Sequence, residues 1–209
     1  MHGLRAGLAI AAVLASATAA EAVCPGLDVL FEDKFDGLKP TWGEASTSEK
    51  VANGQFVLAP PSGTYVWVAN TAGLYDDIDA CVTVTTIAGV DPTEAKAGLM
   101  FWYEDENNFY VFEIAPNAKA SVWRRQRGKW LAQVKWKDAD AANTGDGASN
   151  ELKVSTVGSD ATFYVNGAEF AKLTDGALPD KGQQIGLLAA SPEAGDASFA
   201  FDDLRVTKP

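Results

Sequence analysis

Histidine is nearly missing from this sequence of 209 residues, since its only copy is His2. Without further histidine the chain cannot assemble a Ser-His or Cys-His nucleophilic pair, or a zinc site built on imidazole. Cysteine is almost as scarce, with Cys24 and Cys81 alone, and their spacing excludes a C-x-x-C redox or metal motif. An enzyme that acts through carboxylates alone remains open.

The chain also lacks an apolar run of the roughly 20 residues needed to cross a membrane. The apolar stretch at residues 6–15 follows Arg5 and precedes two small-x-small cleavage sites, which is the pattern of a signal peptide. We expect residues 1–22 to be this signal peptide and residues 23–209 to form one domain. Its destination would be a periplasm or the cell exterior.

Basic residues are outnumbered, with 17 Lys and Arg against 28 Asp and Glu, and the net charge is −11. Because an acidic chain repels polyanions, we expect neither nucleic acid nor a membrane as a partner. A local exception is the basic cluster Arg124, Arg125, Arg127 and Lys129 at a predicted hairpin turn. This cluster is either a solvated tip or a contact for an acidic glycan or a protein partner.

The even cysteine count in an exported chain predicts a disulfide between Cys24 and Cys81, with two free thiols as the alternative. We expect no cofactor and assign no metal ligands. Structural calcium is left open, because the loop at residues 138–146 offers Asp and Asn oxygens. That loop nevertheless misses the EF-hand spacing.

Helical periodicity is almost absent, and short runs of β-favouring residues recur between turn signals. The runs lie at residues 29–35, 55–58, 65–69, 78–87, 97–103, 109–114, 120–125, 130–136, 151–157, 162–165, 185–189 and 198–206. Asn166-Gly167 marks the clearest hairpin, since this pair supplies the positive φ of a type I′ turn. The pattern predicts an all-β sandwich of two antiparallel sheets.

The hairpin predicted at residues 98–114, GLMFWYEDENNFYVFEI, is apolar on both faces of both strands. Such strands are covered on both sides or carry an aromatic surface that faces a ligand. If the hairpin is regular, Glu113 shares a face with Leu99, Phe101, Tyr103, Phe109 and Val111. A carboxylate on an apolar face requires a partner or a ligand.

The following hairpin contains a possible partner for Glu113 and further residues that could bind a ligand. Trp123 and Arg125 face the same way on one strand, and Trp130 and Trp136 share a face on the next. Aromatic rings beside a guanidinium and a carboxylate are typical of a saccharide site. The candidate ligand-binding residues are therefore Tyr103, Glu113, Trp123 and Arg125. The alternative is that the tryptophans belong to the core and that Glu113 forms a salt bridge with Arg125.

Several motifs together resemble the laminin-G-like and concanavalin A-like jelly rolls. They are LFEDKFDG at 30–37, AGLMF at 97–101, NNFY at 107–110, NELKV at 150–154, YVNG at 164–167, GLL at 186–188 and FDDLRV at 201–206. Within that group the chain is most similar to bacterial secreted domains named for 3-keto-disaccharide hydrolysis. The resemblance implies a jelly-roll sandwich, and similar jelly rolls sometimes hold calcium between the first loop and the last strand, here Asp36 and Asp202.

The glucanases of this group carry a Glu-x-Asp-x-x-Glu strand motif that is missing here. We therefore favour a carbohydrate-binding module that is not catalytic, with its ligand on an aromatic sheet face. The alternatives are a glycoside-hydrolase-like enzyme acting through carboxylates such as Glu113, and a structural or adhesion module for a protein partner. Two converging carboxyls would favour the enzyme, because glycoside hydrolysis uses a pair of them.

Overall fold

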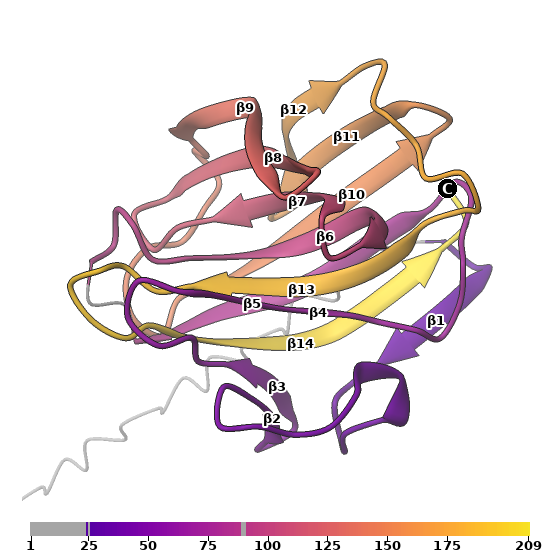
Figure 1. Ribbon diagram of the computed structural model, residues 1–209. Coiled ribbons are helices and arrows are strands. Elements are labelled where there is room, and N and C mark those ends of the chain that lie inside the picture. Colours follow the sequence, from indigo (N-terminus) through magenta and orange to yellow (C-terminus); the bar gives the residue numbers. More distant parts are fainter. Residues whose placement is uncertain (1–23, 25, 89–90) are drawn as a thin grey trace, which may run out of the picture.

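The computed structural model describes residues 24, 26–88 and 91–209, and strands dominate it (Figure 1). The strands are β1 (Val29–Asp33), β2 (Glu49–Ala52), β3 (Gln55–Leu58), β4 (Tyr65–Ala69), β5 (Asp79–Ala88), β6 (Lys96–Asp105), β7 (Asn108–Ile114), β8 (Lys119–Gln126), β9 (Lys129–Asp138), β10 (Ser149–Val157), β11 (Asp160–Val165), β12 (Ala168–Leu173), β13 (Gln184–Ala190) and β14 (Ser198–Thr207). A short 3-10 helix, η1 (Pro40–Trp42), follows β1. Within these ranges no helix is long and apolar enough to span a membrane. The predicted signal peptide lies outside the described residues.

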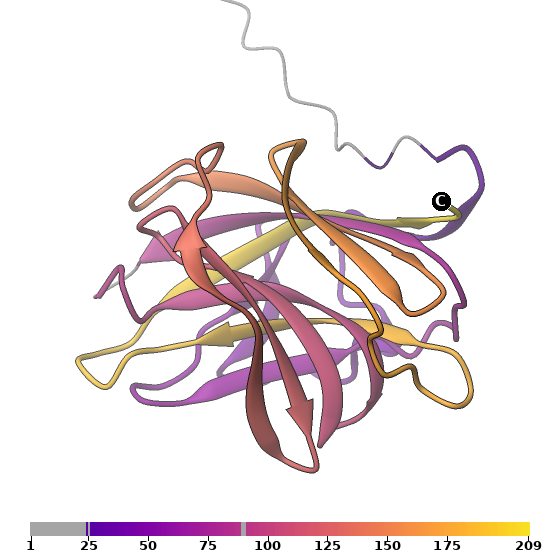
Figure 2. The ribbon, with the colours of Figure 1, turned by 90° about the horizontal axis from the view of Figure 1, so that it is seen from above.

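The strands form two antiparallel sheets, as the strand and turn pattern predicts. One sheet has the order β12-β11-β10-β5-β14-β3-β2, with β1 paired to β14. The other has the order β4-β13-β6-β7-β8-β9. Seen from above, the sheets lie in two layers, with the yellow β14 in one and the golden β13 in the other (Figure 2). The fold is the predicted jelly-roll sandwich.

The core lies between the two sheets. Along β10 and β11, every second residue is buried, which is the period expected of strands with one face inward. Phe163 of one sheet packs against Phe101 and Phe112 of the other, with ring centroids 5.5 and 5.2 Å apart. Burying each such ring stabilises the fold by roughly 1.5–3 kcal/mol, so these contacts join the layers.

Turn chemistry explains how the strands connect. Asn166 and Gly167 both have positive φ, 48° and 79°, and join β11 to β12 as predicted. Asn53 and Gly54, with φ of 53° and 73°, join β2 to β3 in the same way. Every predicted run overlaps a strand, but β2 was not predicted, because its sequence EKVA has too few apolar residues to signal a strand.

Cys24 and Cys81 form the predicted disulfide, and both are fully buried. The bond attaches the segment ahead of β1 to β5, which lies between β10 and β14 in the middle of its sheet. The alternative of two free thiols is therefore wrong.

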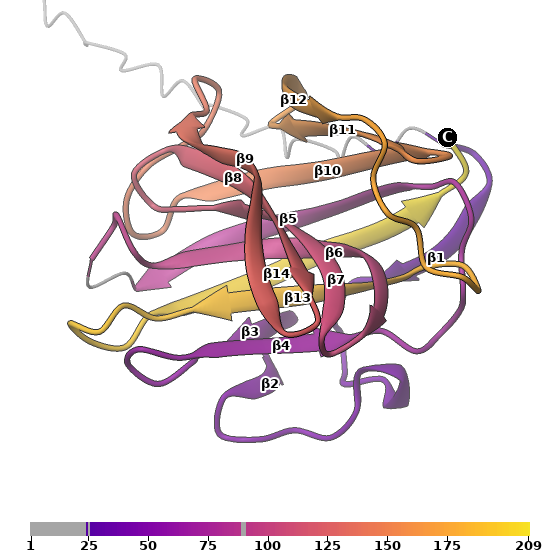
Figure 3. The same cartoon turned by 45° about the horizontal axis from the view of Figure 1, so that its top comes forward.

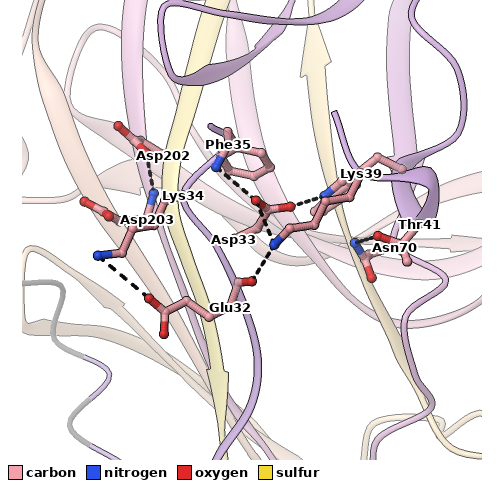
Figure 4. Close-up of polar contacts among 10 residues, drawn as sticks. Glu32, Asp33, Lys34, Phe35, Lys39, Thr41, Asn70, Asp202 and Asp203 are labelled. Carbon is pink, nitrogen blue, oxygen red and sulfur yellow. Dashed lines mark hydrogen bonds and ion pairs between the residues drawn. The ribbon is translucent and has the colours of Figure 1, made fainter. Parts of the chain in front are cut away.

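A buried carboxylate organises the loop after β1 (Figure 4). Asp33 Oδ1 accepts a hydrogen bond from the backbone N of Phe35 at 2.9 Å and lies 3.1 Å from Lys39 Nζ. Its Oδ2 accepts one from Trp42 Nε1 at 2.9 Å. Phe35 has a positive φ of 52°, which is costly for a residue with so large a side chain. The hydrogen bond from its backbone N to Asp33 holds the backbone in this conformation. The Asp33 carboxylate therefore stabilises the loop after β1.

Replacing Asp33 with Asn is expected to lower the free energy of unfolding by about 2–3 kcal/mol. An amide has one acceptor oxygen, so either the Phe35 N–H or the Trp42 Nε1–H would face another donor, and the charge opposite Lys39 would be lost. Urea unfolding measures the change. Asp36→Asn, at an exposed position in the same loop, is the control and is expected to change stability by less than about 0.5 kcal/mol.

Candidate saccharide site on the outer sheet face

The outer face of the six-stranded sheet, which points away from the other layer, has a buried apolar floor. The floor consists of Met100, Phe109, Val111 and Leu188. Partly exposed aromatic side chains pack on and around it, and we refer to the following set as the aromatic face: Tyr65, Trp67, Tyr103, Trp123, Trp130 and Trp136. The hairpin at 98–114 is thus covered by the other sheet on one side and by aromatic rings on the other. Coverage on both sides was one of the two alternatives that its apolar faces predicted.

The predicted sharing of faces within this hairpin was partly wrong. Leu99 pairs with Phe112 and Phe101 with Tyr110, so Leu99 and Phe101 point into the core and not toward Glu113. The reason is the two-residue turn after Asp105, which pairs odd-numbered residues of one strand with even-numbered residues of the next. Tyr103 nevertheless reaches the outer face, because the strand register shifts between Phe101 and Asp105.

A pocket of about 150 Å³ opens on the aromatic face, next to the β8–β9 hairpin that Figure 3 shows alongside β7. Its walls are the side chains of Tyr65, Lys96, Glu113, Trp123, Trp130 and Trp136. Only 2% of Glu113 is exposed, so its carboxylate lies at the base of the pocket. The pocket therefore combines aromatic walls with one acid and one amine.

Few interactions offset the loss of water around the buried Glu113 carboxylate. It pairs across the strands with Ser121, whose hydroxyl lies 3.5 Å from Glu113 Oε2. That hydroxyl accepts a hydrogen bond from Trp123 Nε1 at 3.0 Å, which fixes the indole beside the acid. Burial raises the pKa of Glu113 to about 7, although the charge of Lys96 and the bond from Ser121 act in the opposite direction. A hydrogen-bond donor on a ligand would offset the free-energy cost of burying this carboxylate.

Arg125 does not pair with Glu113, so the predicted salt-bridge alternative is wrong. It lies opposite Phe109, four residues along β7 from Glu113. Its guanidinium carbon is 5.2 Å from the ring centroid of Trp67 and 5.3 Å from that of Trp130. Its Nε donates to the carbonyl oxygen of Glu106 at 3.0 Å. Two indoles and a backbone carbonyl thus hold the guanidinium in place.

The structure brings the four predicted residues onto one face but at two places. Glu113 and Trp123 line the pocket, whereas Tyr103 stacks on Phe109 at 5.7 Å, near Arg125. Sequence reasoning missed Tyr65 and Lys96, whose ring and ammonium lie 5.2 Å apart. These two belong to β4 and β6, which lie on either side of β13 because each pairs with it. No local sequence signal could have joined them.

Two carboxylates at and just before the start of β5 already have partners within the fold. Asp79 forms an ion pair with Lys153 at 2.7 Å, and Asp77 accepts a bond from the backbone N of Gly158. The pKa of Asp202 is raised by burial and by the charges of Asp203 and Asp36. In the described part of the chain, no three His, Cys, Asp or Glu side chains are grouped so that they could hold a metal ion. Neither calcium alternative is thus supported by a group of three such side chains.

Comparison with solved structures identifies the fold. The carbohydrate binding module CBM66 from Bacillus subtilis superposes with a TM-score of 0.58 at 13% identity, over 72% of this chain and 86% of that chain. A β-glucanase from Bacillus licheniformis gives a TM-score of 0.61 at 13% identity, over 86% and 98% of the two chains. A GH43 protein from Bacillus licheniformis gives 0.62 at 18% identity, over 85% and 39%. At these identities the likeness establishes the fold alone.

A comparison with curated protein sequences finds no match. Residues 26–207, in contrast, match the model of a family described as a 3-keto-alpha-glucoside-1,2-lyase-like domain. The match extends from before β1 to the last residue of β14 and so includes both sheets and the pocket. The chain therefore belongs to the family of 3-keto-alpha-glucoside-1,2-lyase-like domains.

Proposed function

We propose that this chain is an exported module that binds a saccharide on the aromatic face without cleaving it. The observation that carries the proposal is Glu113, a buried carboxylate at the base of an aromatic pocket. Within the described residues its one hydrogen bond is the long contact with Ser121. Sugar hydroxyls are donors that would satisfy this carboxylate, while indole rings stack on the apolar faces of sugar rings.

The composition of the pocket supports binding over hydrolysis. Glycoside hydrolysis uses two carboxyl groups about 5 or about 6.5–9.5 Å apart. Glu113 is the single carboxyl among the described side chains that line this pocket. The fold shared with a carbohydrate binding module is in line with the proposal.

A second candidate is an elimination enzyme in which Glu113 acts as the base. The family description names a 1,2-lyase for 3-keto-alpha-glucosides, and the hydrogen on the carbon beside a ketone is acidic enough to be removed by one base. A carboxylate with a pKa of about 7 suits that role near neutral pH. Incubation with a 3-keto-alpha-glucoside distinguishes the two candidates. Product formation that Glu113→Gln abolishes would replace the binding proposal.

Trp123→Ala is expected to weaken saccharide binding about tenfold or more on a glycan array and to change the melting temperature little. The ring is a wall of the pocket and is half-buried, so its loss removes stacking area without opening the core. Tyr164→Ala is the matched control, because Tyr164 is a half-buried aromatic residue on β11 of the other sheet.

Two results would contradict this assignment. A loss of about 3–5 kcal/mol in stability for Trp123→Ala would mean that the ring belongs to the core. Silence of the wild-type protein across neutral and acidic glycans would remove the binding function itself.

Export is part of the proposal. It rests on the signal-peptide pattern of residues 1–22, which would leave residues 23–209 as the mature domain. The Cys24–Cys81 disulfide is in line with it, since such bonds persist in oxidising compartments. N-terminal sequencing of the protein from a bacterial periplasm or culture medium tests both the cleavage and the destination.

A further inference from the structure

We infer that the saccharide bound on the aromatic face carries a carboxylate, and that Arg125 holds this group. The inference rests on the proposed binding function and names the chemical class of its ligand. It places two contacts side by side, with Glu113 bonding sugar hydroxyls in the pocket and Arg125 pairing with a uronic acid group outside it.

Arg125 is built as a preformed anion fork. Trp67 and Trp130 flank the guanidinium, and the carbonyl of Glu106 binds its Nε. Among the described residues the guanidinium hydrogen-bonds only through Nε. Its two Nη nitrogens present the planar geometry that fits a carboxylate. Among the ion pairs within 4 Å that the described residues form, none involves Arg125.

The sequence segment that contains Arg125 differs in charge from the rest of the chain. Residues 119–137 contain seven Lys and Arg and no Asp or Glu, so this stretch carries +7 and the remainder carries −18. The lysines of β9 have another role available, since charged side chains protect an edge strand from pairing. That role cannot explain Arg125, because β8 is paired on both sides.

The acidic turn between β6 and β7 lies beside the tip of the β8–β9 hairpin, where the backbone N of Gly128 bonds the carbonyl of Asn107. Arg125 meets this turn through the backbone carbonyl of Glu106 and not through its carboxylate. The guanidinium charge therefore stays available to a ligand.

Because Glu113 lies in the pocket and Arg125 lies outside it, we place the ligand carboxylate outside the pocket. Glu113 would repel a carboxylate placed in the pocket, so the sugar ring there presents hydroxyls. Trp130 is shared, since it lines the pocket and also flanks Arg125. A sugar chain that leaves the pocket over Trp130 therefore brings its acid group to Arg125.

The test compares acidic polysaccharides with their own neutral forms. Polygalacturonate, alginate and hyaluronan are each presented beside the carboxyl-reduced polymer, together with polyglutamate as a polyanion without sugar rings. We expect the wild-type protein to bind at least one acidic polymer about tenfold more tightly than its reduced form. Polyglutamate is expected to bind no better than the reduced polymers.

Variants then test Arg125 itself. Arg125→Gln is expected to abolish the preference for the acidic form, and Arg125→Lys to lose most of it, because an ammonium keeps the charge but not the fork. Arg124→Gln is the matched control. It removes the same charge from the neighbouring position, where the guanidinium lies 5.3 Å from the centroid of Tyr110, a ring of the core between the sheets.

The outcomes distinguish the inference of a ligand carboxylate from the underlying proposal of saccharide binding. Equal binding of acidic and reduced polymers overturns the inference and leaves saccharide binding standing, whereas silence on these polymers and on a neutral glycan array removes both. Equal binding of polyglutamate, or an acidic preference that survives in Arg125→Gln, overturns the assignment to Arg125. If Arg125→Gln fails to fold, the comparison of acidic with reduced polymer on the wild-type protein decides.

Discussion

Glu113→Gln is expected to stabilise the folded protein by about 3 kcal/mol at about pH 8, although it removes a charge. The pKa of Glu113 is raised to about 7 from an ordinary value of 4.5, chiefly because burial disfavours the ionised form. At alkaline pH the wild-type protein must hold this buried charge, whereas glutamine is neutral throughout. Glutamine also keeps the size of the protonated acid and its carbonyl acceptor.

The direction of the pH dependence follows from proton binding. Between pH 4.5 and about 7 the folded state holds a proton on Glu113 that the unfolded state has lost. Wild-type stability therefore falls as pH rises through this window, and the contribution of Glu113 is level on either side of it. The variant lacks this decrease, so its advantage over the wild type grows across the window.

Chemical unfolding of both proteins at a series of pH values measures the effect. Glu94→Gln, which removes an exposed carboxylate from the turn before β6, is the control and is expected to follow the wild type. Parallel curves for Glu113→Gln and the wild type would contradict a raised pKa. The same variant is expected to bind saccharide more weakly, since it places an NH₂ group where hydroxyl donors meet the acid.

A residue whose removal stabilises the fold and weakens binding is retained for its function and not for packing. Natural sites often keep such residues at a cost in stability. We propose that Glu113 is such a residue, because its one hydrogen-bond partner among the described residues is the Ser121 hydroxyl, 3.5 Å away. Asp33 is the contrasting case, since its three contacts make it part of the structure.

The sheet architecture could be predicted because its signals are local. Asn166-Gly167 specifies its own turn, and the strand runs carry their period in consecutive residues. Glu113 stood out in the same way, as an acid within an apolar strand. The faces of the 98–114 hairpin could not be predicted correctly, because they depend on the length of the turn and on the register shift that redirects Tyr103.

The walls of the pocket depend on topology, which local patterns do not contain. Tyr65 and Lys96 are 31 positions apart and lie on strands that do not touch each other. Both pair with Ala190 of β13, whose small side chain separates them. The pairing of Arg125 was mistaken for a related reason, since cross-strand register puts Ser121 and not Arg125 opposite Glu113.

Removing the Cys24–Cys81 disulfide is expected to lower the free energy of unfolding by about 4 kcal/mol. The two cysteines are 57 positions apart, and the bond restricts the unfolded chain over that whole loop. The loop contains β1 to β4, so both sheets have strands within it. The double variant Cys24→Ala/Cys81→Ala is the appropriate change, because serine would add buried hydroxyl groups at two fully buried positions.

Urea unfolding of the double variant, beside wild-type protein with and without reductant, separates two contributions. The reduced wild type keeps both sulfur atoms and loses only the cross-link, so its decrease reports the loop constraint. Any additional decrease in the double variant reports the missing sulfur atoms in the packed interior. Two alkylatable thiols in the intact mass of the exported protein, or equal stability with and without reductant, would show that the cross-link does not hold β1 to β4 in place.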